Sequence, residues 1–332
     1  MTELFPWQAT SQNYLLQLIA SDRLPHAMLF SGTHGIGKGR LVEWLAHRLL
    51  CHQPTSQGAC GVCRSCLLLK AGSHPDLIQI ESDKASIGVD LIRQAITSLS
   101  ETAHQQGARV VIIEHAQNMT ESASNALLKT LEEPGRQSFL LLTSPSASQL
   151  MATITSRCQN YVVPVPDENI ALEWLQQQGS DATEAHLRLN CGAPLVTQKF
   201  VSDGNHLRLD AFLVRMLGVL KGQVPAQELV DEAVADSPES FAWLCALLLD
   251  VQKVMAGASK DYLVFANHWT ELQGVAAMYD HQCPDWAPWL SRWQLALSGR
   301  GLNLSMQWQA MLSELSLQLG AESALTLSGK LP

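Results

Sequence analysis

A glycine-rich loop near the N-terminus constrains the fold of this chain more than any other feature. Residues 32–38 read Gly-Thr-His-Gly-Ile-Gly-Lys, which is the spacing G-x-x-x-x-G-K of a phosphate-binding loop. The loop follows an apolar run at residues 27–31 and precedes helical spacing at residues 39–50. In that setting, backbone N–H groups and the helix N-terminus face a phosphate. The sequence therefore predicts a strand, a loop and a helix in succession. The candidate phosphate-binding residues of this loop are Gly32, Gly35, Gly37 and Lys38.

The same loop lacks part of the chemistry of nucleotide hydrolysis. An active loop carries Ser or Thr after its Lys, because that hydroxyl binds Mg²⁺, and this chain has Gly39 there. Active sites of this kind also use an acidic pair after a later strand, where this chain has Glu114 and His115. Glu114 could still reach a metal ion, but an imidazole lacks the fixed negative charge that orients water. Both departures predict weak hydrolysis or none, and they leave ATP with Mg²⁺ poorly supported as a cofactor.

Residues 1–165 alternate between strand and helix patterns. Helical spacing recurs at residues 89–99 and 124–131. Further apolar runs predict strands at residues 76–80, 109–114, 139–143 and 161–163. Repeated strand–helix alternation predicts a parallel sheet with helices on both faces. A chain of 332 residues with 46% hydrophobic and 16% charged residues can form two or three such well-cored domains.

The pattern changes after Pro164 and Pro166. Residues 167–205 show the spacing of three short helices, and all further patterns are helical, with most of the nine Trp among them. Large aromatic side chains favour helix-on-helix packing. We therefore expect an α/β domain over residues 1–165, a small helical domain over 166–206 and an all-α domain over 207–332.

Four cysteines cluster in the first domain with the spacing C-x₈-C-x₂-C-x₂-C. Four thiolates within such a short segment are typical of a structural, tetrahedral Zn²⁺ site that is closed to water. His47 and His52 lie nearby, and the sequence leaves open that one of them replaces a thiolate. The predicted zinc module spans about residues 51–66, and its ligands are Cys51, Cys60, Cys63 and Cys66. We expect the other cysteines to be packing residues, Cys158 apart.

Charge and hydropathy exclude several classes of protein. The net charge is −9, and it lies entirely beyond residue 165, because residues 1–165 carry 12 basic and 12 acidic side chains. We find no basic stretch of the kind that a DNA-binding protein usually shows. We also find no apolar run long enough for a membrane helix and no signal-peptide pattern at the N-terminus. These features predict a cytoplasmic protein.

Several motifs together carry a resemblance to a known family. They are residues 25–32 (Pro-His-Ala-Met-Leu-Phe-Ser-Gly), the four-cysteine insertion, residues 124–134 (Ser-Asn-Ala-Leu-Leu-Lys-Thr-Leu-Glu-Glu-Pro) and residues 155–158 (Thr-Ser-Arg-Cys). In this order the motifs resemble the bacterial clamp-loader branch of the AAA+ ATPases. The motor subunit of that branch, gamma/tau, keeps Lys-Thr in its loop, an Asp-Glu pair and a sensor Arg. This chain has Lys38-Gly39, Glu114-His115 and the run 192–194 (Gly-Ala-Pro) instead, so it resembles a subunit without motor activity.

The resemblance implies an architecture and a role. It implies an AAA+ (P-loop NTPase-like) sheet domain with a zinc-binding insertion, a helical lid and a helical collar that joins a pentamer. It also implies that Arg157 is an arginine finger, which reaches the ATP of a neighbouring subunit and stabilises its transition state. The implied partners are the gamma/tau motor subunits, delta, the sliding clamp and, through the complex, primer–template DNA at the replisome.

Other interpretations stay open at this point. A lone Arg such as Arg157 is more often part of a surface ion pair. The loop could be a turn without a ligand, and Glu114 with His115 could be the polar end of a strand. A second hypothesis is an active AAA+ ATPase that uses Glu114 as metal ligand and His115 as base. A third is a zinc-knuckle DNA-binding protein, which the neutral charge near the cysteines disfavours.

Overall fold

The computed structural model describes residues 2–81, 86–100, 102–105, 107–235, 237–278, 286–298 and 303–327, with side chains described as far as residue 315. The chain forms two compact units. The first comprises residues 1–178 and 191–196, and the second comprises residues 179–190 and 197–332. No helix in the described part of the chain is long and apolar enough to span a bilayer.

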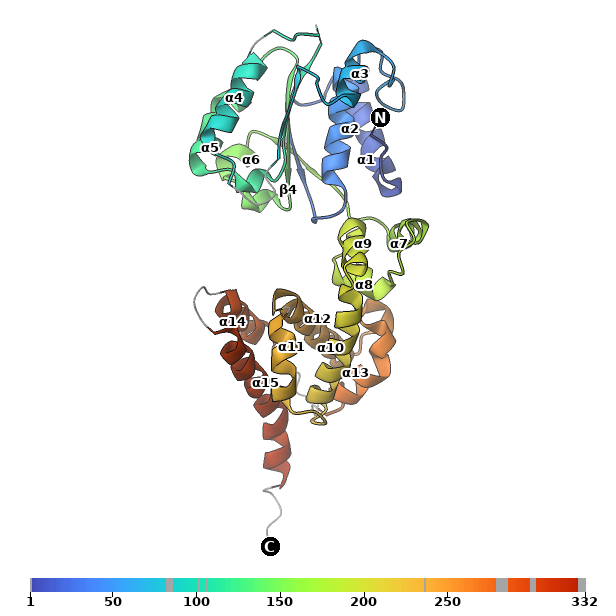
Figure 1. Cartoon of the computed structure of the whole chain (residues 1–332), viewed down its shortest axis with the longest axis vertical. Helices are drawn as coiled ribbons and strands as arrows, with labels where there is room; N and C mark the ends of the chain where they lie inside the picture. The colour runs from blue at the N-terminus through green and yellow to red at the C-terminus, as the bar shows by residue number, and fades with distance from the viewer. Residues whose placement is uncertain are drawn as a thin grey trace. The chain divides into compact units, whose positions relative to one another are not determined.

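A parallel sheet forms the centre of the first unit (Figure 1). Its strand order is β2-β3-β4-β1-β5, so the glycine-rich loop follows an interior strand. The register places Ala27 opposite Leu140 across β1 and β4. The strands are β1 (Ala27–Ser31), β2 (Leu77–Ile80), β3 (Arg109–Ile113), β4 (Ser138–Ser144) and β5 (Gln159–Val162).

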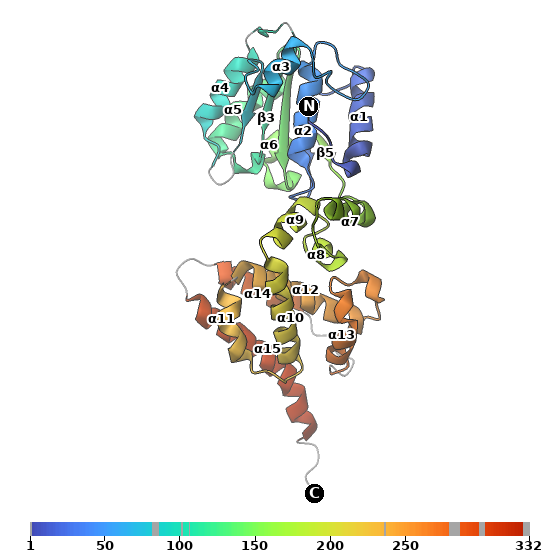
Figure 2. The same cartoon turned by 45° about the vertical axis from the view of Figure 1, so that its right-hand side comes forward.

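Helices cover both faces of this sheet, as the alternating pattern predicts (Figure 2). One face carries α1 (Ala9–Ala20), α2 (Lys38–Leu50) and α3 (Arg64–Lys70). The other carries α4 (Val89–Ser100), α5 (Glu121–Glu132) and α6 (Ala152–Thr155). The unit also holds α7 (Glu168–Gln177) and the short 3-10 helices η1 (Pro6–Gln8), η2 (Ala116–Asn118) and η3 (Ala147–Gln149).

Alternation along the strands divides the apolar side chains between two cores. In β1, Met28 and Phe30 pack with α1 and α2, whereas Leu29 packs on the opposite face with α4 and α5. Every residue of β1 and β3 is buried. Such two-sided burial explains the near-continuous apolar runs from which these strands are predicted.

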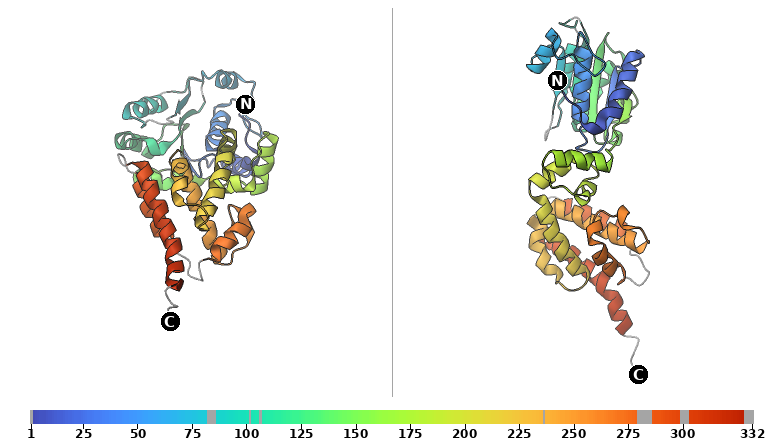
Figure 3. Two further views of the ribbon diagram at one scale, coloured as in Figure 1. Left: turned by 60° about the horizontal axis from the view of Figure 1, so that its bottom comes forward. Right: turned by 90° about the vertical axis from the view of Figure 1, so that its right-hand side faces the viewer.

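The second unit is helical throughout its described residues (Figure 3). Its core includes the fully buried rings of Trp286 and Trp308, which fits the expected helix-on-helix packing. The α-helices are α8 (Glu184–Leu189), α9 (Pro194–Ser202, whose first residues belong to the first unit), α10 (Asn205–Leu220), α11 (Val230–Ala235), α12 (Ser237–Met255), α13 (Trp269–Ala276), α14 (Trp286–Ser298) and α15 (Leu304–Leu327). The 3-10 helices are η4 (Ala226–Leu229), η5 (Lys260–Tyr262) and η6 (Ala266–His268).

The predicted strands and helices are present with small shifts at their ends. The helix predicted from residue 124 begins at Glu121, because the Thr120 hydroxyl accepts a hydrogen bond from Ala123 N–H and caps α5. Three helices occur in the predicted lid as expected, but α7 belongs to the first compact unit and α8 to the second. The division into three domains therefore stays a prediction. Cys191, expected to be a packing residue, is exposed instead. Cys283, for which the same is expected, lies outside the described residues.

Candidate functional site

The glycine-rich loop lies between β1 and α2, as its sequence predicts. Gly37 adopts φ 87°, a conformation that favours glycine, and a Cβ there would lie 2.6 Å from the Phe5 ring. A Cβ on Gly35 would lie 2.4 Å from a methyl carbon of Val196. These two glycines therefore allow the loop to turn and let other segments of the first unit pack directly against it.

Lys38, at the start of α2, directs its ammonium group back into the loop. Its Nζ donates to the carbonyl oxygens of Gly32 at 2.6 Å and Thr33 at 2.8 Å. Burial lowers the pKa of Lys38 to about 8, because desolvation disfavours the charged form. Lys38, the side chain predicted to bind a phosphate, thus forms hydrogen bonds to backbone carbonyls of its own loop.

The N-terminal segment covers the loop from another side. Trp7 Nε1 donates to the Ile36 carbonyl at 2.9 Å, and Gln8 Nε2 donates to the Gly37 carbonyl at 2.7 Å. The Phe5 and Trp7 rings are stacked with centroids 4.8 Å apart, and Trp174 of α7 meets both edge-on. Sequence reasoning missed this contact, because the N-terminal segment and the loop are distant in sequence and their spacing carries no pattern.

Glu114 and Gly39 meet where an active loop would bind a metal ion. A Cβ on Gly39 would lie 3.1 Å from Glu114 Oε2, so this carboxylate packs against the position that lacks the hydroxyl. Burial, followed by the negative charge of Glu81, raises the pKa of Glu114. His115 follows with φ 52°, and its N–H donates to Thr143 Oγ1 at 3.2 Å. Glu114 thus lies against the residue that follows Lys38, while its metal-binding role stays a prediction.

The four predicted cysteine ligands come together from the end of α2, the segment that follows it and the first turn of α3. Their sulfur atoms all lie within 4.8 Å of one another, and Cys51–Cys63 and Cys60–Cys66 are each 3.9 Å apart. A tetrahedral zinc ion with Zn–S bonds of about 2.3 Å needs sulfur atoms about 3.8 Å apart. Backbone N–H groups of Cys60, Cys63 and Cys66 also donate to sulfur atoms within the cluster, which stabilises thiolates. The cluster could therefore hold a metal ion.

The histidine alternatives do not take part in this cluster. His47 Nδ1 lies 3.2 Å from Thr2 Oγ1, and its Nε2 lies 3.8 Å from Glu43 Oε1. Among the described residues, the group able to hold a metal ion consists of the four cysteines. The donor set thus fits a closed, four-sulfur site of the kind that zinc occupies in structural modules.

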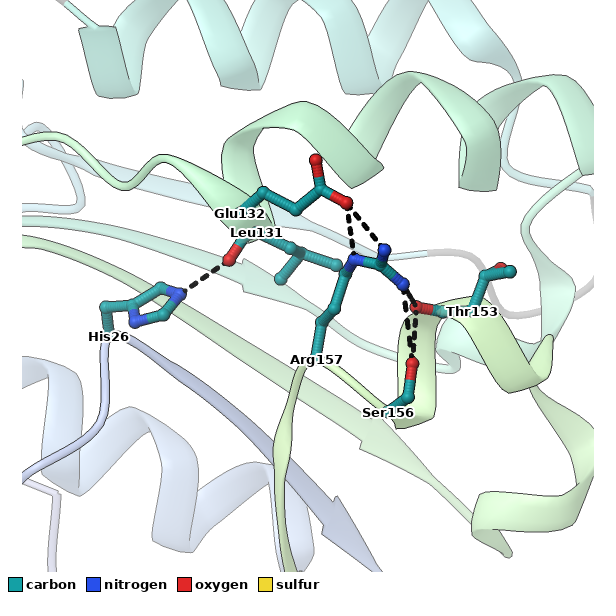
Figure 4. Close-up of polar contacts among 6 residues, drawn as sticks. All are labelled: His26, Leu131, Glu132, Thr153, Ser156 and Arg157. Atoms are coloured by element: carbon teal, nitrogen blue, oxygen red, sulfur yellow. Dashed lines mark hydrogen bonds and ion pairs between the residues drawn. The ribbon is translucent and has the colours of Figure 1, made fainter.

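Arg157 lies between the end of α6 and the start of β5, and its guanidinium contacts the end of α5 (Figure 4). Its Nε and Nη2 donate to Glu132 Oε1 at 2.8 and 2.5 Å. Its Nη1 donates to the Thr153 carbonyl at 3.0 Å. The side chain remains 35% exposed. The structure thus presents an oriented, partly exposed cation on the surface of the first unit.

The sheet, the glycine-rich loop after β1 and the Lys at the start of α2 define a P-loop-type α/β protein. A family model described as DNA polymerase III, delta subunit, matches residues 7–167. DNA polymerase III subunit delta' of Pseudomonas aeruginosa is 34% identical over 325 residues, which cover 94% of this chain and 97% of that protein. The chain belongs to the family of DNA polymerase III delta' subunits.

A second relative agrees with this assignment, and a solved structure covers most of the chain at lower similarity. The delta' subunit of Escherichia coli is 33% identical over 265 residues, which cover 77% of this chain and 78% of that protein. A DNA polymerase III gamma subunit-related protein of Thermotoga maritima covers 93% of this chain and 99% of that chain with 16% identity. Its TM-score of 0.42 is too low to support an argument about this fold.

Proposed function

We propose that this chain is a non-motor subunit of a DNA polymerase III clamp loader and supplies Arg157 to ATP bound by a neighbouring motor subunit. The observation that carries the proposal is the position of Lys38. Its ammonium donates to the carbonyls of Gly32 and Thr33 and would have to leave them to reach a phosphate. A chain with such a loop is suited to complete another subunit's ATPase site rather than to hydrolyse ATP itself.

Three further features of the loop support the absence of motor activity. Gly39 provides no hydroxyl for Mg²⁺, and the Glu114 carboxylate already lies against it. Trp7 and Gln8 occupy two loop carbonyls, and Phe5 packs on Gly37. These contacts fix the conformation of the loop through its carbonyl groups. The alternative of an active ATPase is therefore disfavoured.

Arg157 has the chemistry that an arginine finger requires. Its planar cation can donate two N–H groups to a phosphoryl oxygen pair, and its charge does not depend on physiological pH. A finger supplied in trans contributes about 10³–10⁵ to turnover at the site that it completes. The partial exposure of Arg157 leaves it accessible to a neighbouring subunit.

The cysteine cluster supports a structural zinc ion held by Cys51, Cys60, Cys63 and Cys66. When bound, zinc would supply folding energy to the segment between α2 and α3 and would take no part in catalysis. We assign residues 207–332, which make up most of the second unit, to the collar that joins the subunits of the ring. The proposed partners are the gamma/tau subunits, delta, the sliding clamp and primer–template DNA, in the cytoplasm.

ATP turnover tests the proposal in two parts. The purified chain with Mg²⁺ should hydrolyse ATP no faster than background, and steady turnover by the chain alone would contradict the non-motor assignment. In a reconstituted complex, Arg157→Ala should lower DNA-stimulated turnover at least about tenfold. Arg136→Ala is the matched control, because Arg136 is an exposed arginine on the same unit. Equal turnover of these two variants would contradict the finger role.

A further inference from the structure

We propose that Glu132 is a positioning residue for Arg157, which fixes the arginine side chain before a neighbouring subunit's nucleotide arrives. This inference rests on the proposed function of Arg157. It concerns the acidic residue at the C-terminal end of α5, within the sequence run 124–134. The inference goes beyond the finger itself, because it names the group that holds the finger in place.

The ion pair uses one side of the guanidinium. Both Nε and Nη2 of Arg157 donate to the same carboxylate oxygen of Glu132 (Figure 4). The opposite terminal nitrogen, Nη1, is held by the Thr153 carbonyl and makes a long contact of 3.4 Å with Ser156 Oγ. Since a guanidinium carries five N–H donors, Nη2 keeps one hydrogen for a phosphate, and Nη1 provides a second when its long contact with Ser156 Oγ is broken. Glu132 therefore orients the cation without occupying the edge that a phosphate would use.

Orientation matters because a free arginine side chain has many rotamers. Ordering such a side chain costs side-chain entropy, and an arginine that is already fixed loses less when it binds. The pair is partly exposed, with 35% of the Arg157 side chain and 52% of the Glu132 side chain accessible. Solvent screens its attraction, so the pair holds the arginine weakly enough for it to meet a phosphate.

The end of α5 is itself fixed by the rest of the sheet domain. His26 directly precedes β1, and its Nε2 lies 2.9 Å from the carbonyl oxygen of Leu131 in α5. The last carbonyls of a helix lack partners within the helix, so this contact satisfies one of them. The partial negative charge of a helix C-terminus adds to that of the Glu132 carboxylate and attracts the cation. Because Glu132 belongs to α5, its ion pair holds the Arg157 side chain in a fixed position relative to that helix.

Turnover by the reconstituted complex tests this role. Glu132→Ala should lower the kcat of DNA-stimulated ATP hydrolysis about 3–10-fold and change KM for ATP less than about twofold, since the finger acts in the transition state. The kcat of Glu132→Gln should fall less, because the amide oxygen of Gln can still accept a hydrogen bond from Arg157. Glu133→Ala is the matched control, because it removes the adjacent, exposed acidic residue, and none of the described contacts of Arg157 involves it.

A double variant separates positioning from a general structural effect. If Glu132 acts through Arg157, then Glu132→Ala combined with Arg157→Ala should turn over as slowly as Arg157→Ala alone. Multiplied losses, or a Glu132→Ala variant equal to the Glu133→Ala control, would overturn the inference. Faster turnover by Glu132→Ala would also overturn it, because Glu132 would then restrain the finger. If Arg157→Ala itself has no effect, the proposed function fails rather than the positioning role alone.

Discussion

The Glu114 carboxylate lies against Gly39, at the position where an active nucleotide loop carries its metal-binding hydroxyl. A Cβ on Gly39 would lie 3.1 Å from Glu114 Oε2 and 3.3 Å from Oε1. The glycine that replaces the hydroxyl residue and the acidic residue after β3 are therefore in contact with each other. The second departure, His115, lies outside this contact, because its N–H donates to Thr143 Oγ1.

Restoring the hydroxyl alone should not restore hydrolysis. We expect Gly39→Thr to leave ATP turnover of the purified chain at background, because Lys38 still donates to Gly32 and Thr33 and the N-terminal segment still covers the loop. The added side chain would contact the flexible end of Glu114, so the variant should fold. A phosphate-release assay with Mg²⁺ measures the outcome, and turnover above that of the unchanged chain would contradict this account of the loop.

Zinc should be bound at about one ion per chain and should stabilise the first unit. We expect chelation to lower the unfolding temperature, because a structural zinc site contributes folding energy. Cys63→Ser should abolish zinc binding, because it removes one of four converging thiols. Elemental analysis and thermal unfolding measure both effects.

A cysteine outside the cluster provides the control for the zinc experiment. Cys191→Ser changes an exposed thiol and should leave zinc content and unfolding temperature unchanged. Protein purified without chelators that contains no zinc, and whose unfolding is insensitive to chelation, would show that the cluster is not a zinc site.

Local chemistry determines which parts of this molecule are predictable from its sequence. The strands are readable because burial on both faces demands apolar runs, as in β3, where all of residues 109–113 are buried. The cysteine set is readable because metal ligands share a spacing. The contacts of Trp7 with Ile36 and of Arg157 with Glu132 cannot be predicted from the sequence. Each contact joins residues that are distant in sequence and whose spacing carries no pattern. Tertiary packing alone brings them together.

A buried histidine should make the stability of the first unit depend on pH. His74 Nε2 lies 2.8 Å from Ser65 Oγ, which itself donates to the Leu50 carbonyl, so the histidine must donate there. Its Nδ1 accepts from Asp76 N–H at 3.1 Å, which requires the neutral ring. Burial lowers the pKa of His74, against the nearby Asp76 charge, which raises it. The folded pKa lies below the unfolded value.

Neutral His74 therefore stabilises the folded state above pH 6.5, which is the ordinary pKa of histidine. This stabilisation is lost as the pH falls through the lower pKa of His74 in the folded state. Protonation would break the bond to Asp76 N–H, which is worth about 0.5–1.5 kcal/mol. We expect the urea midpoint to fall less between pH 7.5 and pH 5 in His74→Asn than in the unchanged chain. Faster hydrogen exchange at the Asp76 amide at low pH would accompany this loss. An identical pH dependence of the two proteins would contradict it.

His26 should support both the stability of α5 and the action of Arg157. The contact between His26 Nε2 and the Leu131 carbonyl satisfies the last turn of the helix that ends at Glu132. We expect His26→Ala to lower the free energy of unfolding by about 0.5–1.5 kcal/mol, the worth of one hydrogen bond, and to lower turnover of the reconstituted complex. His26→Gln keeps a side-chain N–H donor and should lose less in both assays. If the Ala and Gln variants lose turnover equally, the contact with Leu131 does not hold α5 in its working position.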